Sequence, residues 1–184
     1  RMTTSTTSRN WQTLVGAWPL DAERAARYLE KATREAKLFT SWLAPDKAHD
    51  RAVRTFVEQV FNNDGLLADA GMFVATIEPF AAANSLTQKL IQLAMPGVPD
   101  TYQGAELATF PLVDPDNRGH VDYGVRREAL RSLLDDKLRV TATTLRLRRD
   151  HPEWFSSYIP LRAAGPAADH LVAFARSDSL VAVA

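Results

Sequence analysis

The stretch that decides the fold reads AMPGVPDTYQGAEL over residues 94–107, and LVDPDNR follows it at 112–118. An apolar segment leads into the stretch, Pro and Gly residues break it, and a short extended run ends at Tyr102. The loop that follows is crowded with side chains that hydrogen-bond hydroxyl groups. A loop of this kind beside a rigid scaffold is typical of a ligand-facing segment.

Three segments carry a resemblance to a known family. The stretch at 94–118 resembles the end of the catalytic barrel in the alpha-amylase superfamily, where the last strand enters a Tyr-x-Gly-x-Glu turn. Its VDPDNR continuation narrows the resemblance to the maltooligosyltrehalose synthase family. WQTLVGAWP at 11–19 and REAKLFTSW at 34–42 look like segments of the same family, in the same order. From about Asn10 onward the chain is therefore similar to the C-terminal portion of that family.

Length and composition restrict the classes of protein that fit. The chain has 184 residues, whereas a complete barrel of this type takes about 250. Its 22 basic and 22 acidic residues balance, so nothing indicates a nucleic-acid or membrane partner. There is no cysteine, which excludes a disulfide framework and a thiol nucleophile. We see no apolar run of about 18 residues and no apolar signal core, and we expect a cytoplasmic protein.

The periodicity predicts a mainly helical chain with a short β segment at its end. We expect helices at 21–34, capped by Asp21, and at 46–61, ended by a turn at 62–65. A further helix runs to about 78 and breaks at Pro79, and a buried helix at 84–94 carries Leu86, Leu90, Ile91 and Leu93. The remaining expected elements are a strand at 98–102, helices at 125–134 and 136–149, and strands at 158–162, 171–176 and 180–183.

The expected fold class is α/β to α+β. We expect residues 1–9 to be a disordered lead-in. The resemblance implies that 10–152 hold a helical insertion and the last part of a (β/α)8 amylase-type barrel, and that 153–184 begin a truncated C-terminal β-sandwich domain. An incomplete barrel leaves apolar surface uncovered, so we expect self-association through that surface.

No residue of this chain is expected to be catalytic. The superfamily rearranges α-glucosidic bonds with two carboxylates about 5 Å apart, and no segment here resembles the surroundings of either acid. The segment at 94–118 contains four carboxylates: Asp100, Glu106, Asp114 and Asp116. These residues are also suited to forming turns and to hydrogen bonding at the end of a strand.

The side chains of this segment are better suited to binding a substrate than to catalysis, because a bound sugar needs an aromatic face together with directional hydrogen-bond donors and acceptors. Two groups are predicted to bind substrate. The first comprises Tyr102, Gln103, Glu106, Asp116, Asn117 and Arg118, and the second comprises Lys37, Thr40, Ser41 and Trp42. Simpler roles stay open: a surface ion pair for Arg118, a core aromatic for Tyr102 or Trp42, and helix termination for Thr40 and Ser41. The four histidines lack metal-ligand spacing, and no metal is predicted.

The resemblance implies a (1->4)-alpha-D-glucan 1-alpha-D-glucosylmutase, an isomerase of trehalose biosynthesis. Such an enzyme turns the reducing-end α-1,4 bond of a maltooligosaccharide into an α,α-1,1 trehalose linkage, and it implies no cofactor. On this interpretation the chain is a fragment that is inactive alone. Two alternatives remain: a helical interaction or scaffold domain, and another glycoside hydrolase of the amylase clan.

Overall fold

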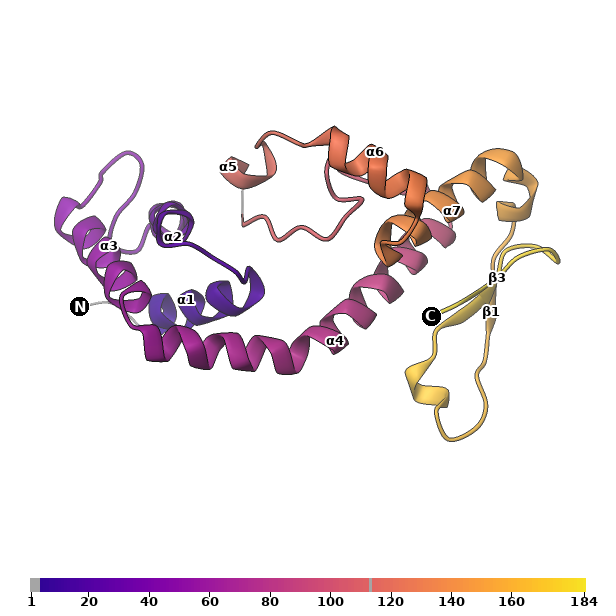
Figure 1. Cartoon of the computed structure of the whole chain (residues 1–184), viewed down its shortest axis with the longest axis horizontal. Coiled ribbons are helices and arrows are strands. Elements are labelled where there is room, and N and C mark those ends of the chain that lie inside the picture. The colour runs from indigo at the N-terminus through magenta and orange to yellow at the C-terminus, as the bar shows by residue number, and fades with distance from the viewer. Residues whose placement is uncertain (1–3, 113) are drawn as a thin grey trace. The chain divides into compact units, whose positions relative to one another are not determined.

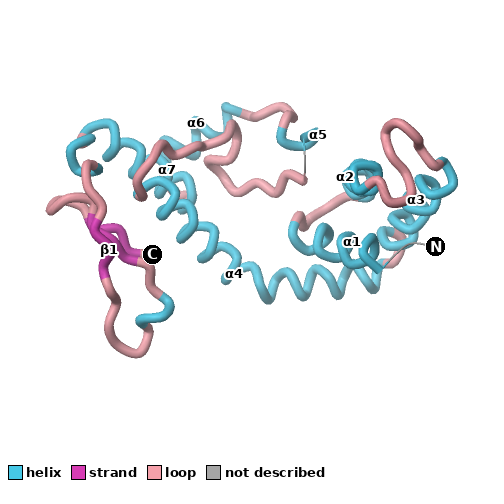
Figure 2. Tube along the Cα trace, turned by 180° about the vertical axis from the view of Figure 1, so that it is seen from behind, coloured by secondary structure: helices cyan, strands magenta, loops and turns pink. Residues whose placement is uncertain are grey.

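The computed structural model describes residues 4–112 and 114–184. The chain forms two compact units. Unit 1 comprises Arg1–Glu78 with Phe110–Gly119, and unit 2 comprises Pro79–Thr109 with His120–Ala184. Figure 1 shows the elements coloured in order from the N-terminus to the C-terminus. Figure 2 shows that helices dominate and that the strands gather in one small sheet.

Unit 1 is built from helices α1 (Thr4–Gly16), α2 (Ala22–Ala36) and α3 (Lys47–Phe61), together with short α5 (Asp114–Asn117). The first turns of α4 (Asp64–Ala94) also belong to it. Small and branched apolar side chains from α1 to α3 form its core: Leu14, Ala17, Leu20, Ala25, Ala26, Leu29, Val53, Val57 and Val60. Because α1 begins at Thr4, residues 4–9 are helical, and the expectation of a disordered lead-in is corrected there.

Aspartate caps explain where two of these helices begin. The Asp21 carboxylate accepts from the backbone N–H of Arg24 at 2.8 Å, and the Asp46 carboxylate accepts from Ala48 and His49 at 2.8 and 3.0 Å. Each bond satisfies an N–H group that the helix itself leaves without a partner. The predicted helices at 21–34 and 46–61 are confirmed, and α3 ends at Phe61 as expected.

Helix α4 differs from the prediction, because it runs unbroken from Asp64 to Ala94 with Pro79 inside it. A proline removes one backbone hydrogen bond and crowds the preceding turn. Pro79 is exposed, where water can satisfy the released carbonyl group, so the helix continues. The predicted break at Pro79 is wrong. The residue does stand at the border between the two units.

Among the described residues, α4 is the one helix long and apolar enough to cross a membrane by length and composition. A single helix of this kind is weak evidence of a membrane span, and none of its apolar window is buried in this structure. Scattered polar side chains interrupt its apolar residues, so the helix is apolar on average although the sequence has no unbroken apolar run of this length.

Unit 2 combines the remaining helices with the sheet. It contains the second part of α4, then α6 (Tyr123–Ser132), α7 (Asp136–Asp150), and the 3-10 helices η1 (Pro152–Phe155) and η2 (Ala168–His170). Strands β1 (Ile159–Leu161), β2 (Ala173–Ala175) and β3 (Val181–Val183) form an antiparallel sheet in the order β1-β2-β3. In the register, Pro160 faces Phe174 and Phe174 faces Ala182. The three predicted strands are confirmed, although each is shorter.

Two further expectations around residue 94 are corrected. The predicted strand at 98–102 is irregular chain, because a short extended segment stays a strand only when a neighbouring strand takes up its backbone hydrogen bonds. In the predicted buried helix at 84–94, Leu93 is buried, but Leu86, Leu90 and Ile91 are only half-buried.

Arg148 on α7 fixes the chain where α4 ends. Its guanidinium donates to the carbonyl oxygens of Leu93 at 2.7 Å, Met95 at 3.2 Å and Gly97 at 2.6 Å. Carbonyl groups at a helix C-terminus lack intrahelical partners and carry partial negative charge, so a cation there is favourable. Arg148 therefore anchors the start of the 94–107 stretch.

Candidate functional site

The loop that carries Tyr102 and Glu106 is a tight turn held by one arginine of α6. The N–H of Ala105 donates to the carbonyl oxygen of Tyr102 at 3.0 Å, and Gly104 adopts a φ of 87°, which favours glycine. Arg126 donates to the Gly104 carbonyl oxygen at 2.7 Å and to a Glu106 carboxylate oxygen at 3.4 Å. A Cβ at residue 104 would lie 3.2 Å from the Arg126 guanidinium and 3.2 Å from a Val121 methyl group, so the conformation favours glycine and a larger residue would have to displace these neighbours slightly.

This turn borders a hollow of about 480 Å³ in unit 2. The volume falls in the range of small-molecule sites. Most of the lining residues are polar, but their apolar atoms contribute as much of the lining surface as their polar atoms do. Tyr102 contributes the only aromatic ring among the lining residues: Ser85, Gln88, Lys89, Gln92, Asp100, Thr101, Tyr102, Ala105 and Lys137. Hydroxyl, amide, ammonium and carboxylate groups in one hollow are suited to a ligand rich in hydroxyl groups.

Two lysines give the hollow its electrostatic character. The Lys89 ammonium donates to Gln92 Oε1 and Thr101 Oγ1, both at 3.0 Å, and the Lys137 ammonium donates to the Leu107 carbonyl oxygen at 3.2 Å. Burial lowers the pKa of both side chains below that of an ordinary lysine, and repulsion from Lys137 lowers the pKa of Lys89 further.

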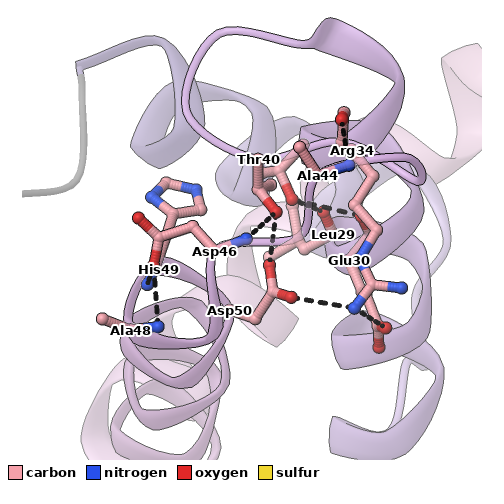
Figure 3. Close-up of polar contacts among 11 residues, drawn as sticks. Leu29, Glu30, Arg34, Thr40, Ala44, Asp46, Ala48, His49 and Asp50 are labelled. Carbon is pink, nitrogen blue, oxygen red and sulfur yellow. Dashed lines mark hydrogen bonds and ion pairs between the residues drawn. The ribbon is translucent and has the colours of Figure 1, made fainter.

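The second predicted group, 37–42, lies in unit 1, and Figure 3 shows the polar contacts around its buried member. Thr40 is 3% exposed. Its hydroxyl donates to Asp50 at 3.1 Å and accepts from the backbone N–H of Asp46 at 3.0 Å. Arg34 donates to the same Asp50 carboxylate at 2.8 Å. The Asp50 hydrogen bond, followed by attraction to Glu30 and Asp50, raises the pKa of Arg34. This arrangement joins the loop to α2 and α3.

The neighbours of Thr40 are more accessible. Lys37 is exposed at the end of α2 with a φ of 55°, and the Ser41 hydroxyl accepts from the N–H of Ala44 at 3.0 Å. Trp42 is 55% exposed, and the Arg34 guanidinium lies 4.8 Å from the centroid of its ring. Thr40 and Ser41 therefore form hydrogen bonds that hold the loop. The ring of Trp42 is exposed on the surface.

The predicted residues 116–118 also belong to unit 1. The Asp116 carboxylate accepts from Arg24 at 3.0 and 3.2 Å and from the N–H of Leu112 at 3.2 Å. Arg24 also donates to the carbonyl oxygen of Phe110 at 3.0 Å. Asp116 thus holds its own loop in shape. Asn117 and Arg118 are exposed.

The structure brings Tyr102, Gln103 and Glu106 together in unit 2 and places the other seven predicted residues in unit 1. Sequence reasoning missed Lys89, Lys137 and Arg126 around the hollow. It also missed Arg24, Arg34 and Asp50, which hold the unit 1 loops. A lysine amid apolar helix residues is a signal that could have drawn attention to Lys89. No local signal marks the contacts of Arg126 with the turn, because Glu106 and Gly104 lie 20 and 22 residues away.

Within the described parts of the chain, no group of three or more His, Asp or Glu side chains is arranged to hold a metal ion. The geometry defines a hollow lined mainly by polar residues beside a turn held by Arg126.

Comparison with known proteins shows what this chain is similar to. A curated relative from Mycobacterium tuberculosis, named as a maltooligosyl trehalose synthase, is 49% identical over 181 residues, which are 93% of this chain and 23% of the relative. The maltooligosyltrehalose synthase structure from Arthrobacter ramosus matches with a TM-score of 0.86 at 38% identity, covering 95% of this chain and 24% of that one.

A further maltooligosyl trehalose synthase structure matches all of this chain and 28% of its own, with a TM-score of 0.87 at 27% identity. The chain matches no protein-family profile. It is homologous to a segment of the maltooligosyltrehalose synthases, so the resemblance found in the sequence is confirmed. The chain spans about a quarter of the length of these relatives.

Proposed function

We propose that this chain carries part of the substrate-binding wall of a maltooligosyltrehalose synthase, an intramolecular transglucosylase of trehalose biosynthesis. The observation that supports this most is the arginine-held turn at 102–106 beside a polar hollow, within a segment 49% identical to a protein named as such a synthase. The ligand of this wall would be a maltooligosaccharide.

Within this wall, Tyr102 offers a ring for the apolar face of a glucosyl unit, because it is 49% exposed at the edge of the hollow. Gln103 and Glu106 would supply hydrogen-bonding groups. In unit 1, Trp42 offers a second exposed ring. Lys37, Asn117 and Arg118 would add polar contacts.

Catalysis is not assigned to this chain. A retaining glycosidase mechanism needs one carboxylate as nucleophile and a second as acid/base. Glu106 and Asp116 are both engaged by arginines that hold their loops, which suits positioning rather than proton transfer. We propose that the catalytic acids lie in parts of a synthase that this chain does not span, and that the chain alone does not convert maltooligosaccharides.

The binding test is a titration of the chain with maltopentaose, followed by calorimetry or by tyrosine fluorescence. Tyr102→Ala is expected to weaken binding by about 10-fold or more, because stacking of a sugar on an aromatic ring is lost. Tyr123→Ala is the matched control: Tyr123 also belongs to unit 2, and the two tyrosines are 48% and 49% exposed.

Equal loss in both variants, or no saturable binding by the parent chain, would contradict the proposed wall. A parallel incubation with maltopentaose should yield no non-reducing trehalosyl product, and turnover by a preparation free of host enzymes would contradict the proposal that the acids lie elsewhere. Specific capture of a protein, with no response to saccharide, would instead support a helical interaction domain.

A further inference from the structure

The turn that carries the proposed wall forms no strand, so no β ladder fixes its backbone. Side chains from three helices of unit 2 fix this part of the chain instead. Gln92 on α4 holds the chain before the turn, by donating to the carbonyl oxygen of Asp100 at 2.7 Å. Lys137 on α7 holds the chain after it, by donating to the carbonyl oxygen of Leu107 at 3.2 Å. Of these three side chains, Arg126 on α6 is the one that reaches the turn itself.

All three guanidinium nitrogens of Arg126 donate to protein oxygens. Nη2 donates to the carbonyl oxygen of Gly104 at 2.7 Å, and Nε donates to the Glu106 carboxylate at 3.4 Å. Nη1 donates to the carbonyl oxygen of Asp122 at 3.1 Å. The guanidinium is therefore tied both to the turn and to the start of its own helix. Its planar fork bridges acceptors in a way that a lysine ammonium cannot reproduce.

The start of α6 is fixed in turn by a cap. The Asp122 carboxylate accepts from the backbone N–H groups of Gly124 at 2.9 Å and Val125 at 3.1 Å. Such a cap sets the residue at which a helix begins. It therefore sets the position from which Arg126, one helical turn later, reaches the turn.

Arg126 is placed to act on a ligand through the turn rather than by contact. It is not among the residues that line the hollow, and its side chain is 17% exposed. Tyr102 does line the hollow, and its carbonyl oxygen accepts from Ala105 within the turn. Arg126 grips the residues that follow Tyr102, so it fixes the conformation from which the tyrosine ring is presented.

Arg126 also determines where the Glu106 carboxylate lies. Burial lowers the pKa of Lys89 and Lys137, and attraction to Glu106 acts against this lowering in both. The carboxylate is therefore close enough to attract either lysine, but it pairs with Arg126. Without Arg126, the carboxylate would lose this partner and be drawn toward the lysines, which would pull the turn out of shape.

We propose that Arg126 is a positioning residue of the substrate wall. It holds the turn in the conformation that binds a maltooligosaccharide, and it does not touch the sugar. This inference rests on the proposed function, because its effect is measured as saccharide binding. The turn is then ordered before the ligand arrives, so that binding does not have to supply the free energy of ordering it.

The test is a calorimetric titration of the full chain with maltopentaose. Arg126→Met is expected to weaken binding about 5-fold, the size expected when a side chain must be ordered during binding. Arg126→Lys should recover little of this loss. Arg131→Met is the matched control, because Arg131 is an exposed arginine of the same helix, paired with Glu128 at 2.8 Å. It should bind like the parent chain. Thermal melts check that each variant is folded at the temperature of the titration.

A double-mutant cycle separates positioning from a general loss of stability. If Arg126 acts through the turn, it has less to position once the Tyr102 ring is gone. The combined variant Tyr102→Ala/Arg126→Met should therefore lose less affinity than the product of the two single losses. A general effect on folding would give the full product, because the two substitutions would then act independently.

Gly104→Ala disturbs the same contact from the other side, and it tests the inference even if Arg126→Met fails to fold. Residue 104 has a φ of 87°, and its Cβ would lie 3.2 Å from the Arg126 guanidinium, so this variant should also weaken binding. Gly165→Ala is the matched control, because Gly165 has a φ of 101°, no atom within 4 Å of an added Cβ, and no place in the lining of the hollow.

Hydrogen exchange provides a measurement that needs no ligand. The Ala105 N–H, which bonds within the turn, should exchange faster in Arg126→Met than in Arg131→Met, because the turn opens more often. Unchanged exchange would overturn the inference whether or not the saccharide binds.

The binding results distinguish the two proposals. If the parent chain binds maltopentaose and folded Arg126→Met binds it equally well, the inference is wrong and the proposed function stands. Fully multiplicative losses in the cycle, or equal weakening by Gly104→Ala and Gly165→Ala, would also reject the positioning role alone. No saturable binding by the parent chain would contradict the proposed function, and the role of Arg126 in binding would be withdrawn with it.

Discussion

At the residue scale, Thr40 was predicted to bind substrate, and the structure shows it holding a loop. Its side chain is buried, and its hydroxyl joins Asp50 to the backbone of Asp46. Thr40→Val keeps the shape of the side chain but removes both hydrogen bonds, so the part-buried N–H of Asp46 and one oxygen of the Asp50 carboxylate each lose a partner. We expect the free energy of unfolding to fall by about 1–3 kcal/mol, measured by urea denaturation.

The control for this prediction is Thr109→Val, because Thr109 is exposed in a loop. It should unfold like the parent chain. If Thr40→Val were as stable as the parent and weakened saccharide binding instead, the hydroxyl would be a ligand contact, and the structural role described for it would be wrong.

At the element scale, the start of α3 makes stability depend on pH. Hydrogen bonds from the backbone N–H groups of His49 and then Ala48 hold the pKa of Asp46 below its ordinary value of 3.8. A carboxyl group with a lowered folded-state pKa stabilises the folded state above the ordinary value, and this stabilisation is lost as the pH falls through the lowered pKa. The difference in melting temperature between the parent chain and Asp46→Ala should thus be largest near neutral pH and shrink below about pH 4.

Two variants sharpen the test at this helix. Asp46→Asn retains a capping oxygen, so it should melt closer to the parent chain at neutral pH than Asp46→Ala does. Asp69→Ala is the control, because Asp69 is exposed inside α4 and does not cap a helix. A melting difference for Asp46→Ala that stayed constant from pH 7 to pH 3 would show that the carboxylate charge contributes nothing to the cap.

At the scale of the whole molecule, exposed apolar surface is the dominant feature. Met72, Phe73 and Phe80 on α4 are 64%, 54% and 70% exposed, and related synthases are about four times as long as this chain. Exposed apolar surface of this kind favours association. We expect the chain to bind an apolar dye and to self-associate with rising concentration, as measured by light scattering.

Phe73→Lys should reduce both dye uptake and association, because it places a charge on the exposed face of α4. Leu43→Lys provides the comparison, since Leu43 is 99% exposed but lies in a loop of unit 1. A parent chain that stays monomeric and takes up no dye would show that the apolar side chains of α4 do not drive association.

Local chemistry could be predicted from the sequence because its causes lie within a few residues. Aspartates before helix-forming runs placed the starts of α2 and α3, and short apolar runs between turns placed β1, β2 and β3. The VDPDNR and KLFTSW segments also pointed to the correct relatives. A cap or a turn depends on neighbouring residues alone, so the amino-acid order is sufficient to determine it.

Only the tertiary structure decided which side chains meet. Arg126 reaches back to Gly104, Arg24 reaches Asp116 across 92 residues, and Lys137 joins Lys89 at one hollow. Such contacts depend on how helices far apart in the chain pack, which periodicity does not specify. The same reason explains the strand expected at 98–102, since an extended segment needs a neighbouring strand as well as a suitable sequence. The sequence therefore predicted the caps, the turns and the candidate side chains. Which side chains line the hollow, and which loops Thr40 and Asp116 hold, depends on tertiary packing.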